Sequence, residues 1–170
     1  DPGASGALAM YRPEDTTLAQ VMDMPTHTIK INGSNKRRVD PHGLTDLVRT
    51  RKDDIAFACI EQVSSLPKQG VASTFAFGQA FMAVEMVCAA LQVPYYTVTP
   101  AVWKRVMQAT GDKDEARRLA SRLLPEAANN WTRVKDDGRA EAALLAIYGF
   151  RVYGMNHGLR IAYPDGDLLS

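Results

Sequence analysis

The 170-residue sequence has few cysteines and no long uninterrupted apolar run, and both absences narrow the class of protein. Its two cysteines, Cys59 and Cys88, lie far apart in apolar segments, which is typical of buried, reduced thiols in a cytosolic protein. No stretch of about 18 or more apolar residues is present, so no membrane span is predicted. The first residues lack the basic-then-apolar pattern of a signal peptide. With 46% hydrophobic and 23% charged residues, the chain is expected to form one globular domain.

Two common site motifs are also missing. The three histidines are scattered and show no zinc-ligand spacing; they are His27, His42 and His157. The turn at Ser5-Gly6 lacks the Gly-x-x-x-x-Gly-Lys pattern, which argues against a nucleotide-triphosphate site.

Positive charge is unevenly distributed although the net charge is only +1. The segment 28–52 contains seven Lys or Arg residues, among them Lys36, Arg37 and Arg38, against Asp40 and Asp46. A basic strip of this kind suits phosphate binding, but it is equally consistent with a solvated charged face.

The hydrophobic pattern predicts alternating strands and helices, hence a mixed α/β sheet flanked by helices on both faces. The predicted strands are Gly6–Tyr11, Thr28–Ile31, Ile55–Glu61 and Val93–Thr99. The predicted helices run from Pro41 (after an Asp40 N-cap) to about Arg51, Gly70–Leu91, Ala101–Ala109, Asp112–Leu124 and Asp137–Tyr153. Asn32-Gly33 has turn chemistry.

The predicted helix 70–91 is apolar on two faces and has one charged residue, Glu85. One stripe contains Phe77 and Phe81, and the other contains Phe75 and Met82. A helix of this kind is buried on two sides. We predict that one side packs on the sheet and the other meets the same helix of a second subunit; deep burial within one monomer is the alternative.

Four carboxylates carry the strongest functional signal: Asp1, Glu61, Asp137 and Glu141. Asp1 opens a turn-rich stretch, Glu61 ends an apolar run, and Asp137 and Glu141 share a helical face because they are four residues apart. These contexts predict that all four lie at one end of the sheet. Clustered acids repel one another unless cations lie among them, and hard cations such as Mg²⁺ prefer oxygen ligands. The sequence therefore suggests a metal-dependent nuclease.

Several motifs together resemble the RNase H-like superfamily, and within it the RuvC-type Holliday junction resolvases. The matching segments are Asp1-Pro2-Gly3 with Ser5-Gly6, Ile60-Glu61-Gln62, Thr99-Pro100-Ala101-Val102-Trp103-Lys104, and Lys135-Asp136-Asp137-Gly138-Arg139-Ala140-Glu141-Ala142. The last motif is most similar to the plastid and phage branch, in which the Asp137 position is often His.

The resemblance implies an RNase H-like nuclease domain over residues 1–153, with a tail at 154–170. In that family an apolar strand precedes the first aspartate, so the strand upstream of Asp1 is expected to be missing from this sequence. The implied activity is the symmetric nicking of four-way branched DNA by a homodimer, with no membrane involved. The implied location is cytoplasmic, in a bacterial or phage-encoded protein, or organellar if a transit peptide was removed.

The resemblance also assigns roles to individual residues. Asp1, Glu61, Asp137 and Glu141 would bind two Mg²⁺ ions, for which Mn²⁺ could substitute. Lys113 matches a basic residue near the scissile phosphate, although an ordinary lysine at a helix N-terminus is the alternative. The residues expected to contact DNA are basic: Lys104, Arg105, Lys68, Arg139, Lys36, Arg37 and Arg38.

Other functions stay open at this point. One is another RNase H-fold nuclease that acts on RNA–DNA hybrids or flaps, and another is a non-catalytic junction-binding protein. A phosphotransferase of the actin and sugar-kinase type would need a second domain that 170 residues cannot hold. Either Asp136 or Asp137 could be the ligand, and we favour Asp137 because it shares a helical face with Glu141.

Overall fold

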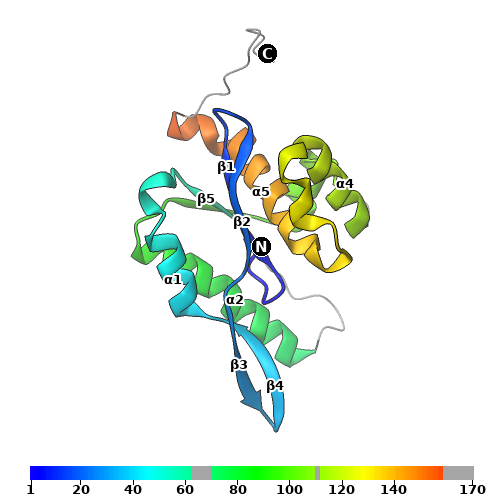
Figure 1. Cartoon of the computed structure of the whole chain (residues 1–170). Helices are drawn as coiled ribbons and strands as arrows, with labels where there is room; N and C mark the ends of the chain where they lie inside the picture. Colours follow the sequence, from blue (N-terminus) through cyan, green and yellow to red (C-terminus); the bar gives the residue numbers. More distant parts are fainter. Residues whose placement is uncertain (63–69, 110–111, 159–170) are drawn as a thin grey trace.

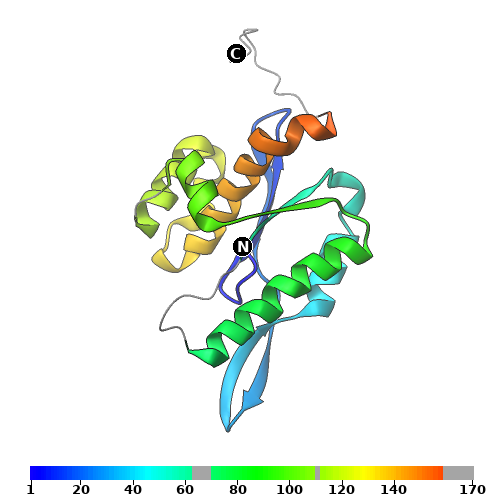
Figure 2. The same ribbon diagram turned by 180° about the vertical axis from the view of Figure 1, so that it is seen from behind.

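The computed structural model describes residues 1–62, 70–109 and 112–158, except the side chain of Lys113. Residues 63–69, with the predicted DNA contact Lys68, and most of the tail 154–170 lie outside the described ranges. Helix α5 (Asp137–Tyr153) lies beside the N-terminal strands, with α4 (Lys113–Leu123) on one side and α1 (Pro41–Arg49) on the other (Figure 1). Helix α2 (Val71–Ala90) crosses the lower part of the molecule (Figure 2). The predicted mixed α/β class is confirmed.

In the described part of the chain, the strands form three separate pairs rather than the single sheet that the sequence predicted. Strand β1 (Ala7–Arg12) pairs antiparallel with β2 (Thr17–Asp23), and β3 (Thr26–Ile31) pairs antiparallel with β4 (Ser34–Val39). Strand β5 (Ala58–Glu61) pairs parallel with β6 (Tyr95–Val98).

An apolar cavity separates two of these pairs. Its volume is about 420 Å³, and its lining includes β1 along its whole length and Ala58–Ile60 of β5. Within the described ranges, β1 pairs only with β2, and β5 only with β6. Strand β5 starts at Ala58 rather than at the predicted Ile55, and Ile60 is its buried residue.

The helix ends follow local sequence signals. Asp40 caps α1 by accepting a hydrogen bond from the backbone N–H of His42 (3.1 Å), and Pro41 occupies the first turn. Asp112 caps α4 in the same way through Glu115 N–H (2.8 Å). Helix α3 (Pro100–Val106) also begins with proline, directly after β6.

Two buried clusters hold the elements together. The first joins α3, α4 and α5 and includes Trp103, Trp131 and Leu144. The second joins α1, α2 and β5 and includes Leu44 and Val87. Helix α5 is buried along most of its length, so its first turn is held in a fixed position.

Helix α2 buries only one of its faces. Its buried residues are Ala80, Val87 and Cys88, while its large exposed apolar side chains are Val71, Phe75, Phe77, Met82 and Met86. Burial of both faces within one monomer, the alternative left open above, is therefore not what the structure shows. By length and composition alone α2 could also cross a membrane, although a helix of this kind is weak evidence for that.

Candidate active site

The loop at the start of the chain brings Asp1 against the first turn of α5. Gly6 N–H donates to Gly3 O (2.8 Å), and the Asp1 amino group donates to Ala7 O (3.2 Å). A Cβ atom on Gly6 would lie 2.2 Å from Asp1 O and 2.8 Å from the Asp1 carboxylate. A Cβ on Gly138 would lie 2.7 Å from Ser5 O and 3.5 Å from Asp1 Oδ2. Glycine is thus required at both positions for the loop and the helix to approach so closely.

Three of the four predicted acids line one pocket. The pocket has a volume of about 310 Å³ and is lined by Asp1, Asp137 and Glu141, and also by Arg37 and Arg38 of β4. The structure thus brings Asp1 to the start of α5, whereas Glu61, the fourth acid of the predicted group, is not part of this lining. It also places two arginines of the basic strip at the same pocket.

Glu61 lies near this group but does not line the pocket. Helix α3 links it to this group, because Trp103 contacts Glu61 and the adjacent Lys104 contacts Glu141. Glu61 itself accepts a hydrogen bond from Trp103 Nε1 (2.6 Å), a contact that the sequence did not predict.

Helix α3 supplies a cation that contacts one of the acids. Lys104 Nζ donates to Glu141 Oε1 (2.6 Å), and the two side chains are 30% and 18% exposed. The same ammonium lies 5.3 Å from the centre of the Trp103 ring. Lys104, predicted to contact DNA, is therefore engaged with a predicted catalytic acid.

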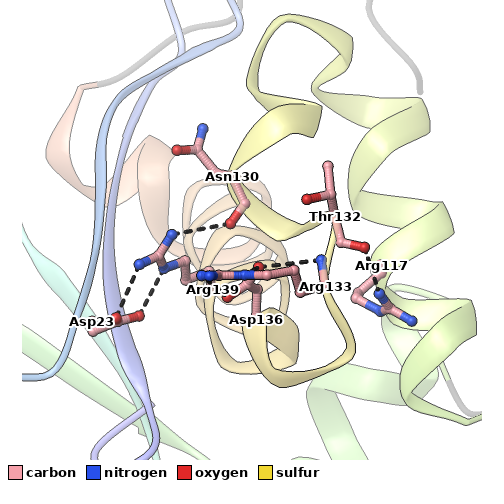
Figure 3. A network of polar contacts seen from close by, with 7 residues as sticks. All are labelled: Asp23, Arg117, Asn130, Thr132, Arg133, Asp136 and Arg139. Atoms are coloured by element: carbon pink, nitrogen blue, oxygen red, sulfur yellow. Dashed lines mark hydrogen bonds and ion pairs between the residues drawn. The ribbon is translucent and has the colours of Figure 1, made fainter.

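The two adjacent aspartates at the start of α5 have different surroundings, and Figure 3 shows those of Asp136. Asp136 is buried and accepts three hydrogen bonds from Arg133: from the backbone N–H (3.2 Å), Nε (2.9 Å) and Nη2 (2.8 Å). The Arg133 side chain is the main cause that lowers the pKa of Asp136 to about 2. Asp136 is committed to this pair, while Asp137 lines the pocket, which favours Asp137 as the functional acid.

Arg139 ties α5 to β2 and to the segment before α5 (Figure 3). Its Nε and Nη2 donate to the two oxygens of Asp23 (2.7 and 2.9 Å), and its Nη1 donates to Asn130 O (3.2 Å). Because three donors of its guanidinium are engaged inside the protein and the side chain is 24% exposed, Arg139 is placed as a structural tie rather than as a free DNA contact. No local sequence pattern indicated that Arg139 would contact Asp23 or Asn130.

The remaining predicted residues are spread around the site. Lys36 is exposed on β4, and Arg105 is exposed on α3. Lys113 is the first residue of α4, and its side chain lies outside what the structure describes.

The donor chemistry suits a hard divalent cation, since carboxylate oxygens from Asp1, Asp137 and Glu141 surround one pocket. In residues 1–62, 70–109 and 112–158, however, no three Asp, Glu, His or Cys side chains come close enough together to hold one ion. Trp103 and Lys104 already donate hydrogen bonds to the carboxylates of Glu61 and Glu141. The metal site stays a prediction.

Comparisons with known proteins give limited information. No family model and no curated protein matches the chain. Among solved structures, the chain is similar to one described as Thermus thermophilus RuvC structure, with 16% sequence identity and a TM-score of 0.49, covering 85% of this chain and 95% of that one. At that identity and TM-score the likeness assigns no function, and it does not support the plastid and phage branch.

Proposed function

We propose that the chain is an RNase H-like, metal-dependent endonuclease that nicks four-way branched DNA. The observation that carries the proposal is the single pocket shared by Asp1, Asp137 and Glu141, with Arg37 and Arg38 on its lining. Such a pocket offers oxygen ligands for cations and positive charge for a phosphate backbone. The motif resemblance narrows the substrate to branched DNA.

Each residue has a stated task in this proposal. Asp1, Asp137 and Glu141 hold the cations at the pocket, and Glu61 completes the set from the end of β5. Two Mg²⁺ ions, or Mn²⁺ in their place, would supply Lewis-acid stabilisation of the attacking and leaving oxygens of the phosphodiester. Trp103 holds the Glu61 carboxylate, and Lys104 balances the charge of Glu141. Lys113 would counter charge that develops on the scissile phosphate.

The proposed enzyme acts as a homodimer through α2, because two nicks on a symmetric junction require two sites. The exposed side chains Phe75, Met82 and Met86 support this: each is more than half exposed, on a helix with no charged residue other than Glu85. An apolar surface of this kind marks an interaction site. Isologous pairing of two α2 helices would bury it.

The test is cleavage of a labelled synthetic four-way junction in Mg²⁺, beside linear duplex and RNA–DNA hybrid controls. We expect paired symmetric nicks on the junction alone. If only the RNA–DNA hybrid is cut, the protein is a nuclease of another class. If no substrate is cut, the alternative of a non-catalytic junction-binding protein is favoured.

Neighbouring substitutions sharpen the site assignment. Asp137→Asn and Glu61→Gln should abolish cleavage and retain junction binding. Asp136→Asn is the matched control, because it removes one adjacent carboxylate that is tied to Arg133; it should keep cleavage at temperatures below its own melting point. Equal loss in Asp136→Asn and Asp137→Asn would contradict the assignment.

A further inference from the structure

The β3–β4 ribbon, residues 26–39, is positively charged. It contains Lys30, Lys36, Arg37 and Arg38 and no Asp or Glu. Among the residues that the structure describes, none of these four cations forms an ion pair, whereas Lys104 is paired with Glu141 and Arg139 with Asp23. Three of the four are consecutive, so they repel one another until an anion approaches.

The ribbon also extends away from the rest of the molecule. Both views show it projecting beyond α2, with its turn at the far end (Figures 1 and 2). That turn is Asn32-Gly33, and both residues have positive φ (49° and 78°), as a tight two-residue hairpin requires. Nearly all side chains toward the turn are exposed, so packing does not account for the projection.

The register distributes the cations over both faces of the ribbon. Arg38 lies opposite His27 and Lys36 opposite Ile29, while Arg37 lies opposite Thr28. Because side chains alternate along a strand, Lys36 and Arg38 share one face, and Lys30 and Arg37 share the other. A two-stranded ribbon fits the major groove of duplex DNA, where charge on both faces meets both phosphate backbones.

The base of the ribbon adjoins the candidate active site. Arg37 and Arg38 line the same pocket as the acids, and Arg37 donates a hydrogen bond to Ala4 O in the loop that follows Asp1. Positive charge therefore continues from the acidic pocket outward along the ribbon. A strand of six residues is about 20 Å long, which corresponds to roughly six nucleotides along one DNA strand.

We infer that the β3–β4 ribbon is a phosphate-binding arm that holds one duplex arm of the branched DNA next to the cut. This inference rests on the proposed function, because it takes the acidic pocket as the place of cleavage. The contacts are to the phosphate backbone, so the arm contributes affinity and orientation rather than sequence preference.

Two variants with equal charge change test the arm. The arm variant is Lys30→Gln/Lys36→Gln/Arg38→Gln; it leaves Arg37, which is bonded to the Asp1 loop, in place. The control is Arg49→Gln/Arg51→Gln/Lys52→Gln, which removes the same charge at the far end of α1. Junction binding is measured over a range of salt concentrations, with Ca²⁺ in place of Mg²⁺ and the recovered DNA checked to be intact.

We expect the arm variant to bind the junction about 10- to 100-fold more weakly at physiological salt, with a log–log salt slope shallower by about 2 to 3. The control should stay within about twofold of wild type. In a hydroxyl-radical footprint, the arm variant should lose protection over roughly six nucleotides of one duplex arm and keep it at the branch point. Equal effects in both variants, or none in the arm variant, would overturn the inference.

The wild-type chain separates the two proposals. If it binds the junction but cleaves nothing, the proposed nuclease function fails while the binding comparison still decides the arm. If it cleaves the junction and the two variants behave alike, the arm fails and the nuclease stands. If it binds no DNA, both are wrong.

Discussion

Replacing Gly138 with alanine should separate Asp1 from the first turn of α5. The added Cβ would lie 2.7 Å from the carbonyl oxygen of Ser5, which is backbone and cannot rotate away. The same Cβ would lie 3.5 Å from Asp1 Oδ2. The loop that follows Asp1 must therefore move away from α5, and Asp1 moves with it.

The expected stability change is a balance of two effects. Alanine is favoured over glycine in a helix interior by about 1 kcal/mol. Overpacking a close contact costs about 1–3 kcal/mol. The net effect at Gly138 is a loss of about 0–2 kcal/mol, or a fall in Tm of up to about 8 °C for a domain of this size.

Two other helical glycines provide matched controls. A Cβ on Gly78 of α2 would meet no atom within 4 Å, so Gly78→Ala should raise the free energy of unfolding by about 1 kcal/mol. A Cβ on Gly149 would lie 2.7 Å from Cys59 Cβ, so Gly149→Ala carries a comparable packing cost away from the Asp1 loop. Gly78→Ala tests the sign of the change in unfolding free energy. Gly149→Ala separates the effect of lost stability on cleavage from the effect of a displaced Asp1.

The assays are thermal unfolding and Mg²⁺-dependent junction cleavage well below every Tm. We expect Gly138→Ala to cut about 10- to 100-fold more slowly, as a misplacement of about 1 Å at a reacting centre produces. Gly149→Ala should lose less than about threefold, since its effect on the acids is indirect. The reasoning is refuted if Gly138→Ala is as stable and active as Gly78→Ala, or if Gly149→Ala loses as much cleavage as Gly138→Ala.

Three more predictions follow from the same contacts. Arg133 lowers the pKa of Asp136 from its ordinary value of 3.8 to about 2. The ionised Asp136 therefore stabilises the fold fully above pH 3.8, and this contribution is lost as the pH falls toward 2. The difference in Tm between wild type and Asp136→Asn should shrink in a pH series from 5 to 2.5. Trp103→Phe removes the donor to Glu61 and should lower the free energy of unfolding by about 1.5–3 kcal/mol in urea titrations, whereas Glu61→Gln keeps an acceptor and should cost much less. Met82→Glu should abolish self-association in sedimentation, because it places a charge in the exposed apolar face of α2; dimers that persist in Met82→Glu would exclude α2 as the interface.

The helices were predictable because their signals are local. Helix α5 has the bounds that the apolar pattern indicated, and Asp40 caps α1 as its sequence suggested. Strand β4 was missed because its three consecutive cations show no apolar alternation; it becomes a strand by pairing with β3. The turn residues Asn32-Gly33 were the available signal, since this dipeptide favours a hairpin.

The sequence predicted that these acids lie near one another, but it did not predict which side chains they contact. Asp1, Asp137 and Glu141 line one pocket, as their motif positions suggested. The bond between Arg139 and Asp23 joins residues 116 positions apart, and no local pattern indicates a contact of that kind. A motif predicts which residue types gather, whereas the pairing of each charge depends on how the whole chain packs.

Helix α3 determines how strongly the acids can hold a cation. Trp103 Nε1 and Lys104 Nζ donate to Glu61 and Glu141 at 2.6 Å each, so two acids already have donors that satisfy an oxygen. The Lys104 ammonium also reduces the negative charge that would otherwise disfavour placing several carboxylates together. In the proposed nuclease, a divalent ion at Glu141 would repel this ammonium, and a nearby phosphate would attract it. Cation binding and DNA binding would then be coupled through Lys104, because the cation weakens its pairing with Glu141 and the phosphate offers it another partner.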